Sequence, residues 1–214
     1  LKVVCQNPQA WIIAGYAGLM YVPLSAFADL WGTPFFAQLF QTDRTIAASI
    51  TSMIYIGIAV GSPLITYLSD RYENRTLFMK TGAFICLVIY IIAIYIPHVP
   101  SSFMYVLLFI AGIAFTGQVL SFVLITQTLP RFATGVAVGL TNMLVMSSGV
   151  IFEPLVGKLL TFAGKPVYDH GSMYYAVEDF QIALSVVPLS LLAAFILAFS
   201  IKEPVRKKYR SLHG

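Results

Sequence analysis

Long apolar stretches separated by short polar ones fill almost the whole chain. A helix needs about 20 apolar residues to cross a hydrocarbon core about 30 Å thick. Six stretches are long enough to do so: Trp11–Phe40, Ile46–Ser69, Leu77–Ile96, Phe103–Leu129, Phe132–Thr161 and Phe180–Ile201. This pattern predicts an all-α membrane protein with six transmembrane helices.

Composition and periodicity exclude the other fold classes. The chain is 58% hydrophobic and 10% charged, whereas a soluble domain carries about 25% charged residues. The strands of a membrane barrel would alternate apolar and polar positions, but residues 191–199 are apolar throughout. The expected surroundings are therefore a lipid bilayer.

Basic residues cluster in alternate connections, as expected when they are retained on the cytoplasmic side. Ten of the 13 Lys and Arg residues fall on one predicted side: Lys2, Arg71, Arg75, Lys80, Arg131, Lys202, Arg206, Lys207, Lys208 and Arg210. Both termini are therefore predicted to be cytoplasmic. A net charge of +4 is also compatible with nucleic acid or acidic lipid as a partner. Retention of the positive charge explains it more simply, so we expect no nucleic acid partner.

The cysteine and histidine residues give no sign of a metal or a cofactor. Cys5 and Cys86 lie 81 residues apart, without the paired spacing of a disulfide framework or a metal site. The three histidines, His98, His170 and His213, fall in predicted connections or the tail. The opening residues carry no signal-peptide pattern and are typical of a fragment.

Most connections are short, which predicts that consecutive helices are antiparallel neighbours. Only Gly164–Asp179 is long. The first apolar stretch is interrupted at Asp29–Phe36, where Gly32 and Pro34 release backbone hydrogen bonds. Two compatible interpretations stay open: a break that is buried or faces a cavity, and a helix end followed by a short interfacial helix capped by Thr33.

The second connection, Thr66-Tyr-Leu-Ser-Asp70-Arg71-Tyr-Glu-Asn-Arg75-Thr76, resembles a motif of the major facilitator superfamily. There, Gly-x-x-x-Asp-Arg-x-Gly-Arg-Arg/Lys joins the second and third helices of each half. This chain has Thr66 in place of the first Gly, and Arg75 falls one residue late. The stretches from Gly139 to Gly157 and from Ile201 to Pro204 also resemble the last two helices of bacterial members.

The resemblance implies that residues 1–214 form one domain, the carboxy-terminal half of a twelve-helix transporter. Its six helices would be two inverted three-helix repeats. An amino-terminal six-helix half would be the partner, and the two halves would rock about a site between them.

The resemblance also implies a latch on the cytoplasmic side, formed by Asp70, Arg71 and Arg75. We expect Asp70 to lie near the start of the fifth helix at Phe132–Gly135, where the helix dipole would stabilise a carboxylate. The simpler alternative is that these charges only retain the loop in the cytoplasm.

Two acidic residues fall inside predicted spans, where an unpaired charge costs about 2.5–3.5 kcal/mol or more. Glu153 lies about twenty residues into the fifth helix, on one face with Asn142 and Gly149. Asp29 lies at a comparable depth, following Tyr21 at two steps of four residues. We predict proton coupling through Glu153 or Asp29. Alternatively, Glu153 lies near the outer interface and Asp29 only caps a broken helix.

Candidate residues for the substrate cavity come from three helices. The fourth carries a small or polar stripe in which Gln118 and Ser121 are the polar members. Tyr16 and Tyr21 on the first helix and Asn142 on the fifth would face the same cavity. Packing alone would also explain the small residues of the stripe.

These features predict a secondary active transporter of a small polar or organic solute, working by alternating access in a bacterial inner membrane. A channel or a non-transporting scaffold is the alternative, although no filter loop is present. An enzyme is not expected, because Gly-x-Ser-x-Gly and His-Glu-x-x-His are absent.

Overall fold

The fold was obtained as a computed structural model, which describes residues 2–96, 98–164, 167–169 and 172–203. The predicted residues Lys165 and His170 and the basic residues of the tail beyond Glu203 lie outside this part. Within the described residues, six helical spans are long and apolar enough to cross a membrane, which confirms the predicted all-α membrane fold.

Several of the six spans consist of more than one helical segment. The first contains α2 (Pro8–Val22), the π-helix η1 (Pro23–Trp31) and α3 (Gly32–Phe40), after the short α1 (Lys2–Cys5). The second and third are α4 (Arg44–Arg71) and α5 (Arg75–Tyr95). The fourth joins α6 (Ser101–Phe115) and α7 (Gly117–Thr128). The fifth joins the 3-10 turn η2 (Arg131–Ala133) and α8 (Thr134–Ala163), and the sixth joins α9 (Val177–Ala183) and α10 (Val186–Ala198).

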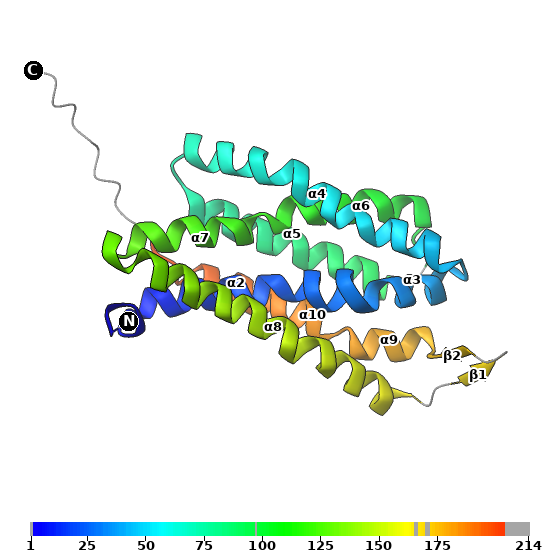
Figure 1. The fold of residues 1–214 in the computed structure, drawn as a ribbon. Coiled ribbons are helices and arrows are strands. Elements are labelled where there is room, and N and C mark those ends of the chain that lie inside the picture. Colours follow the sequence, from blue (N-terminus) through cyan, green and yellow to red (C-terminus); the bar gives the residue numbers. More distant parts are fainter. Residues whose placement is uncertain (1, 97, 165–166, 170–171, 204–214) are drawn as a thin grey trace, which may run out of the picture.

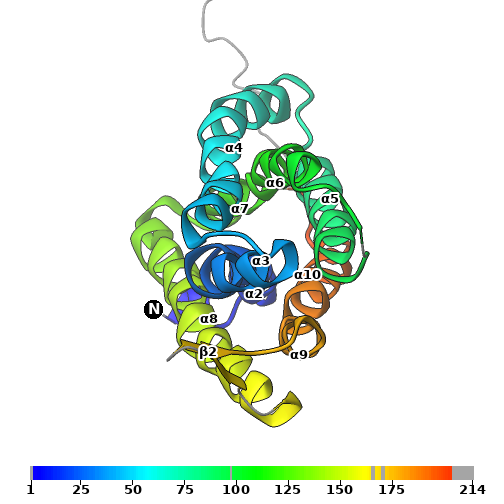
Figure 2. The ribbon, with the colours of Figure 1, turned by 90° about the vertical axis from the view of Figure 1, so that its right-hand side faces the viewer.

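The spans run side by side, and the described ends of the chain lie at the same end of the bundle (Figure 1). We call this the terminal end. Seen along the bundle, α2 lies near the centre, while α4 and α8 lie on different sides of it (Figure 2). These two helices are the least buried of the six spans.

The packing follows an internal symmetry between the first three spans and the last three. The second span packs on the fourth through α4 and α6, and the fifth packs on the first through α8 and α2. Likewise, the third packs on the fourth through α5 and α6, and the sixth packs on the first through α10 and α2. If the first, second and third spans exchange places with the fourth, fifth and sixth, each of these helix pairs becomes another of them. Two inverted repeats are expected to pack in this way.

Small residues bring the helix backbones together. A Cβ atom on Gly57 would lie 2.2 Å from the carbonyl oxygen of Phe109, and one on Gly112 would lie 2.1 Å from that of Ile54. No side chain fits at either position. Membrane helices gain packing contacts in this way, since lipid removes the hydrophobic drive for helices to associate.

The first span is interrupted earlier than the sequence predicted. The backbone widens into η1 from Pro23, and Gly32 closes it by donating its backbone N–H to the carbonyl of Phe27. A separate helical segment, α3, does follow the interruption, but it continues the first span, its first residue is Gly32 and Pro34 is its third. Thr33 is not its cap. Its hydroxyl instead lies 3.2 Å from that of Thr51 on α4.

The long connection carries a short antiparallel hairpin of β1 (Val167–Asp169) and β2 (Ser172–Tyr174), with Val167 opposite Tyr174. After it, the Asp179 carboxylate accepts a hydrogen bond of 3.2 Å from the backbone N–H of Ala176, at the start of α9. The hairpin lies at the end of the bundle opposite the terminal end (Figure 1).

Candidate functional site

An acidic cluster lies where η1 meets α4 and α8. The hydroxyl of Tyr55, on α4, donates a hydrogen bond to the carboxylate of Asp29 on η1. Tyr21, two turns before Asp29, interacts electrostatically with the carboxylates of both Asp29 and Glu153. The structure therefore brings together three residues that the sequence singled out, and it adds Tyr55.

Glu153 reaches this cluster because Gly149 has no side chain. A Cβ atom on Gly149 would lie 3.0 Å from Oε1 of Glu153 and 3.5 Å from Cβ of Ser25. The carboxylate thus lies along α8 on the side of η1. Trp31 fixes the backbone nearby, because its indole N–H donates to the carbonyl of Glu153 at 3.1 Å.

The members of the cluster lie at a similar level along the bundle. Tyr55 is eleven residues from the start of α4, Asp29 eleven from the end of α3, and Glu153 ten from the end of α8. At a rise of 1.5 Å per residue, all three lie about 15 to 17 Å from the end opposite the termini. This common depth places the three residues in one layer of the bundle, inside the spans rather than in a connection.

The two carboxylates have no basic partner within the described chain. Among those residues, the ion-pair distance is met by Asp70 and Arg75 alone, far along α4 from Tyr55. Asp29 is exposed and Glu153 is partly exposed on the surface of this six-helix unit. The negative charge therefore needs a proton, water, a cationic ligand or a partner outside the described residues.

The other predicted cavity residues are placed differently from one another. Tyr16 is fully buried and donates to the carbonyl of Met79 at 2.8 Å, so its hydroxyl serves helix packing. Gln118 and Ser121 are buried at the start of α7. Asn142 is exposed on α8. Of the five predicted cavity residues, Tyr21 is the one that joins the acidic cluster.

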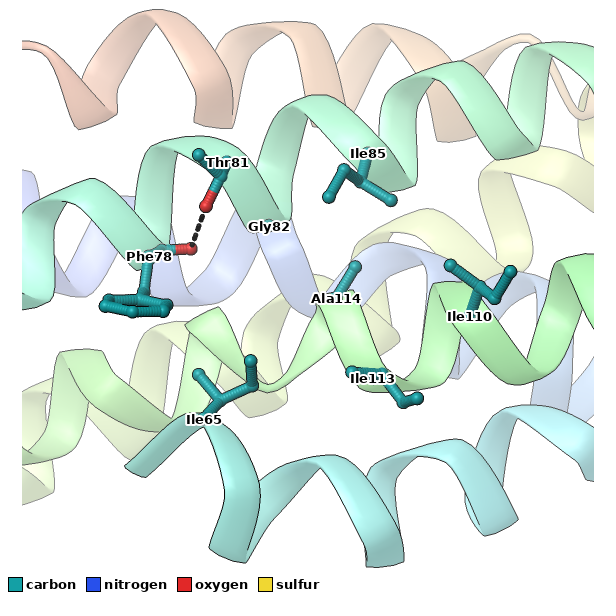
Figure 3. Close-up of a pocket in the computed structure, with 8 residues that line it drawn as sticks. All are labelled: Ile65, Phe78, Thr81, Gly82, Ile85, Ile110, Ile113 and Ala114. Atoms are coloured by element: carbon teal, nitrogen blue, oxygen red, sulfur yellow. Dashed lines mark hydrogen bonds between the residues drawn. The ribbon is translucent and has the colours of Figure 1, made fainter. Parts of the chain in front are cut away.

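A separate pocket of about 100 Å³ lies between α4, α5 and α6 (Figure 3). Its lining is apolar apart from Thr81, whose hydroxyl donates to the carbonyls of Leu77 and Phe78 in its own helix. It offers a polar solute no hydrogen bond or charge, so the acidic cluster is the better candidate site.

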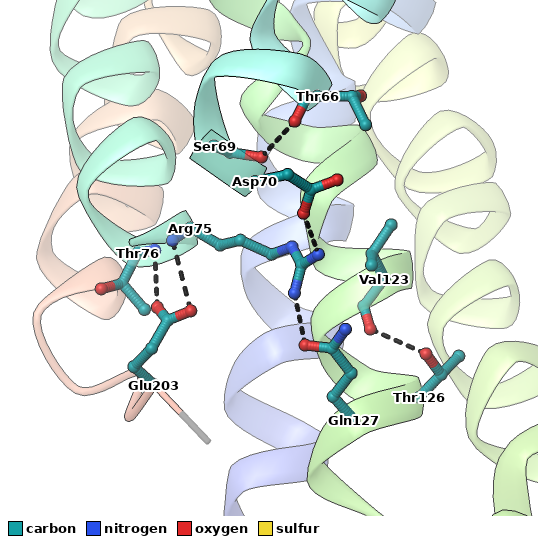
Figure 4. A network of polar contacts seen from close by, with 9 residues as sticks. All are labelled: Thr66, Ser69, Asp70, Arg75, Thr76, Val123, Thr126, Gln127 and Glu203. Carbon is teal, nitrogen blue, oxygen red and sulfur yellow. Dashed lines mark hydrogen bonds and ion pairs between the residues drawn. The ribbon is translucent and has the colours of Figure 1, made fainter. Parts of the chain in front are cut away.

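A second polar network lies at the terminal end (Figure 4). Arg75 is 4% exposed, and its guanidinium group pairs with the carboxylate of Asp70 and donates to the side-chain carbonyl of Gln127 on α7. Arg71 is not part of it; this exposed side chain donates to the hydroxyl of Tyr67 at 3.2 Å. The predicted latch residues thus separate into a joined pair and an outlying arginine.

The expected position of Asp70 beside the start of the fifth helix does not follow from the packing. Within the described chain α4 packs on α6, while α8 packs on α2. The ion pair of Asp70 is with Arg75, which begins the next helix, α5. The network therefore joins the second, third and fourth spans.

The segment after α10 is bound on two sides. Glu203 accepts hydrogen bonds from the backbone N–H groups of Arg75 and Thr76, at 3.2 and 2.9 Å, and so caps α5. The side chain of Gln9 donates to the carbonyl of Ser200 and accepts from the N–H of Lys202, at 2.9 and 3.0 Å. This segment, residues 200–203, ties the first span to the third.

Sequence reasoning gave no role to Tyr55, Gln127 or Glu203. Tyr55 and Gln127 each contact a residue on another helix, 26 and 52 positions away in the sequence. No local sequence pattern signals such contacts. The sequence did show that Glu203 directly follows the last apolar stretch. Acids favour helix N-termini, so this carboxylate was a candidate cap for another helix.

Within the described chain, six spans run side by side in two internally related sets of three, an arrangement typical of helical membrane transporters. The whole described chain lies within the match to one family model, the Major Facilitator Superfamily, which covers residues 2–214. The chain belongs to this superfamily of transporters. No curated protein matches it.

Proposed function

We propose that this chain is one half of a secondary active transporter that moves a small polar or organic solute by alternating access. The observation that carries the proposal is the acidic cluster of Asp29, Tyr55, Tyr21 and Glu153. Substrate and ion sites of such transporters lie near the middle of the bilayer, beside interrupted helices. Here the cluster adjoins the interruption η1 in the first span.

The second half would pack against α4 and α8. These spans leave large apolar side chains exposed, among them Val60, Leu64, Met143 and Val150. On α8, Gly135 and Gly139 are spaced by four residues, and a Cβ atom on either would meet nothing within 4 Å. Paired small residues of this kind let another membrane helix approach closely. A six-helix amino-terminal unit between α4 and α8 would cover the exposed side of the acidic cluster.

The coupling ion we propose is a proton, carried by Asp29 or Glu153. An ionised carboxylate at this depth is costly without a partner, so protonation lowers the cost of moving the loaded site between the two sides. Tyr55 can donate to Asp29 when it is ionised, which supports a carboxylate that alternates between two protonation states.

Asp70 and Arg75 are proposed to hold the terminal end closed in one state of the cycle. Their network joins α4, α5 and α7, so separating these helices would break it. The basic bias of this end supports a cytoplasmic location in a bacterial inner membrane, and Arg71 would contribute to that bias.

The proposal is tested with the full-length transporter in proteoliposomes. Pools of labelled solutes are offered with an imposed proton gradient and without one. We expect at least one solute to accumulate only with the gradient, and accumulation to fall at least about tenfold in Asp29→Asn or Glu153→Gln. The control is Asp43→Asn, an exposed acid just before α4. Gradient-dependent accumulation that neither substitution alters would contradict a coupling role for these carboxylates.

A further inference from the structure

Two polar groups without a hydrogen-bond partner in the described chain both lie near Gly149, beside the acidic cluster. The side chain of Ser25 is 2% exposed, and its hydroxyl has no partner in the described chain. It lies 3.9 Å from the position of a Cβ atom on Gly149, and Oε1 of Glu153 lies 3.0 Å from the same position. The described residues likewise give the Glu153 carboxylate no hydrogen bond or ion pair.

A buried hydroxyl without a partner is unusual, because burial removes its hydrogen bonds to water and nothing replaces them. An ionised carboxylate can only accept hydrogen bonds, whereas a hydroxyl can both donate and accept. A ligand that satisfies both groups at once must therefore carry N–H or O–H donors. The negative charges of Glu153 and Asp29 favour a positive one.

We propose that Glu153 and Ser25 form a subsite for the protonated amino group of an organic amine. This inference rests on the proposed transport function and names the class of its solute. One N–H of the ammonium group would donate to the Glu153 carboxylate and another to the hydroxyl of Ser25. Tyr21 would lie beside the amine, since it interacts with Glu153 as well as with Asp29.

The neighbouring acid has a different role in this arrangement. Asp29 already accepts a hydrogen bond from Tyr55, so the coupling proton is assigned to Asp29 and the amine to Glu153. A carboxylate or phosphate solute would be repelled by both acids. A quaternary ammonium ion would satisfy the charge but leave the Ser25 hydroxyl without a donor.

The experiment compares three probes of one chain length: butylammonium, butyltrimethylammonium and butan-1-ol. Binding to the purified full-length transporter is measured by isothermal titration calorimetry. We expect butylammonium to bind most tightly, butyltrimethylammonium more weakly and butan-1-ol not measurably. Charge-assisted hydrogen bonds contribute about 1.5–3 kcal/mol, so Glu153→Gln should lower the affinity for butylammonium at least about tenfold.

Two further substitutions keep the test decisive should Glu153→Gln fold poorly. Ser25→Ala should lower the affinity for butylammonium about fivefold and leave the affinity for butyltrimethylammonium unchanged, because the substitution removes only a hydrogen bond. Gly149→Ala should lower the affinity for both ammonium ions, since the added methyl group would displace the carboxylate of Glu153. Glu178→Gln, an exposed acid at the start of α9, is the matched control and should change neither.

Equal binding of butylammonium and butan-1-ol, or equal affinities in Glu153→Gln and Glu178→Gln, would overturn the subsite. Its failure is distinguishable from failure of the transport proposal. Gradient-driven uptake of another solute, lost in Asp29→Asn, would leave transport standing without the amine subsite. Butylammonium binding of the expected order without gradient-driven uptake would leave the subsite standing without coupled transport.

Discussion

Asp29 and Glu153 lie at similar depths, yet the described chain stabilises them differently. Asp29 accepts a hydrogen bond from a phenol, whereas Glu153 has only the backbone contact of Trp31 beside it. Each ionised group costs about 2.5–3.5 kcal/mol or more in the membrane when nothing offsets it. The difference supports the separate roles proposed for them, a proton carrier and a ligand-binding group.

The hydrogen bond from Tyr55 can be tested by removing one atom. Tyr55→Phe leaves Asp29 without its donor, and a hydrogen bond to a charged group contributes about 1.5–3 kcal/mol. We expect the initial rate of gradient-driven uptake to fall at least about tenfold. The control is Tyr105→Phe, which removes a hydroxyl that contacts Ser49 at 2.6 Å. A similar loss of uptake in both variants would contradict a specific role for Tyr55.

Residue identity alone predicted part of this site. An acid inside an apolar stretch is visible in the sequence because so few residues there are charged, which is how Asp29 and Glu153 were found. Tyr16 and Tyr21 look equivalent in the sequence. They differ in the fold because the hydroxyl of Tyr16 donates to the carbonyl of Met79 on α5, while Tyr21 lies within electrostatic range of the two carboxylates.

At the level of the helices, the interruption of the first span was predicted in kind but placed too late. Gly32 and Pro34 attracted attention as helix breakers, yet the backbone already departs at Pro23. Proline lacks the N–H that would bond one turn back, so the helix widens there. Gly32 ends the widened segment, because a Cβ atom there would lie 2.7 Å from the carbonyl oxygen of Phe27.

Close contact between α4 and α6 gives a prediction about stability. Gly57→Ala places a methyl group 2.2 Å from the carbonyl oxygen of Phe109, so the two helices must separate. Overpacking of this kind costs about 1–3 kcal/mol. We expect a lower midpoint in thermal unfolding of the purified protein. Gly15→Ala is the control, because its methyl group would meet only Leu197, at 3.8 Å. Equal midpoints for the two variants would contradict the packing described.

The cap that Glu203 provides to α5 gives a second prediction at this scale. Glu203→Ala removes the acceptor for two backbone N–H groups and a negative charge at a helix N-terminus. Such caps contribute about 0.5–2 kcal/mol. Thermal unfolding should therefore show a loss of stability, whereas Lys202→Ala should show none, because only the backbone of Lys202 is bound. The account of this cap is wrong if the two variants unfold alike.

On the scale of the whole molecule, the number and order of spans followed from the apolar stretches. Their arrangement did not, because a span that is apolar all round does not reveal which face meets a neighbour. The resemblance supplied the arrangement, and the match to the superfamily and the paired contacts of α4 with α6 and α8 with α2 agree with it. The low burial of α4 and α8 supports the side proposed for a second half.

The central claim is that the face of α8 beside the acidic cluster is open to each side of the membrane in turn. Met146 lies on this face, two turns before Glu153, and is 48% exposed. The most direct measurement is labelling of Met146→Cys with an impermeant thiol reagent, from each side of oriented vesicles, in a full-length protein without other reactive cysteines.

We predict labelling from both sides, with a changed ratio when Asp70→Asn is added, because Asp70 would no longer pair with Arg75 to hold the terminal end closed. Arg71→Gln, at the outlying arginine, should leave the ratio unchanged. Labelling from one side only, at a rate that Asp70→Asn does not alter, would contradict alternating access.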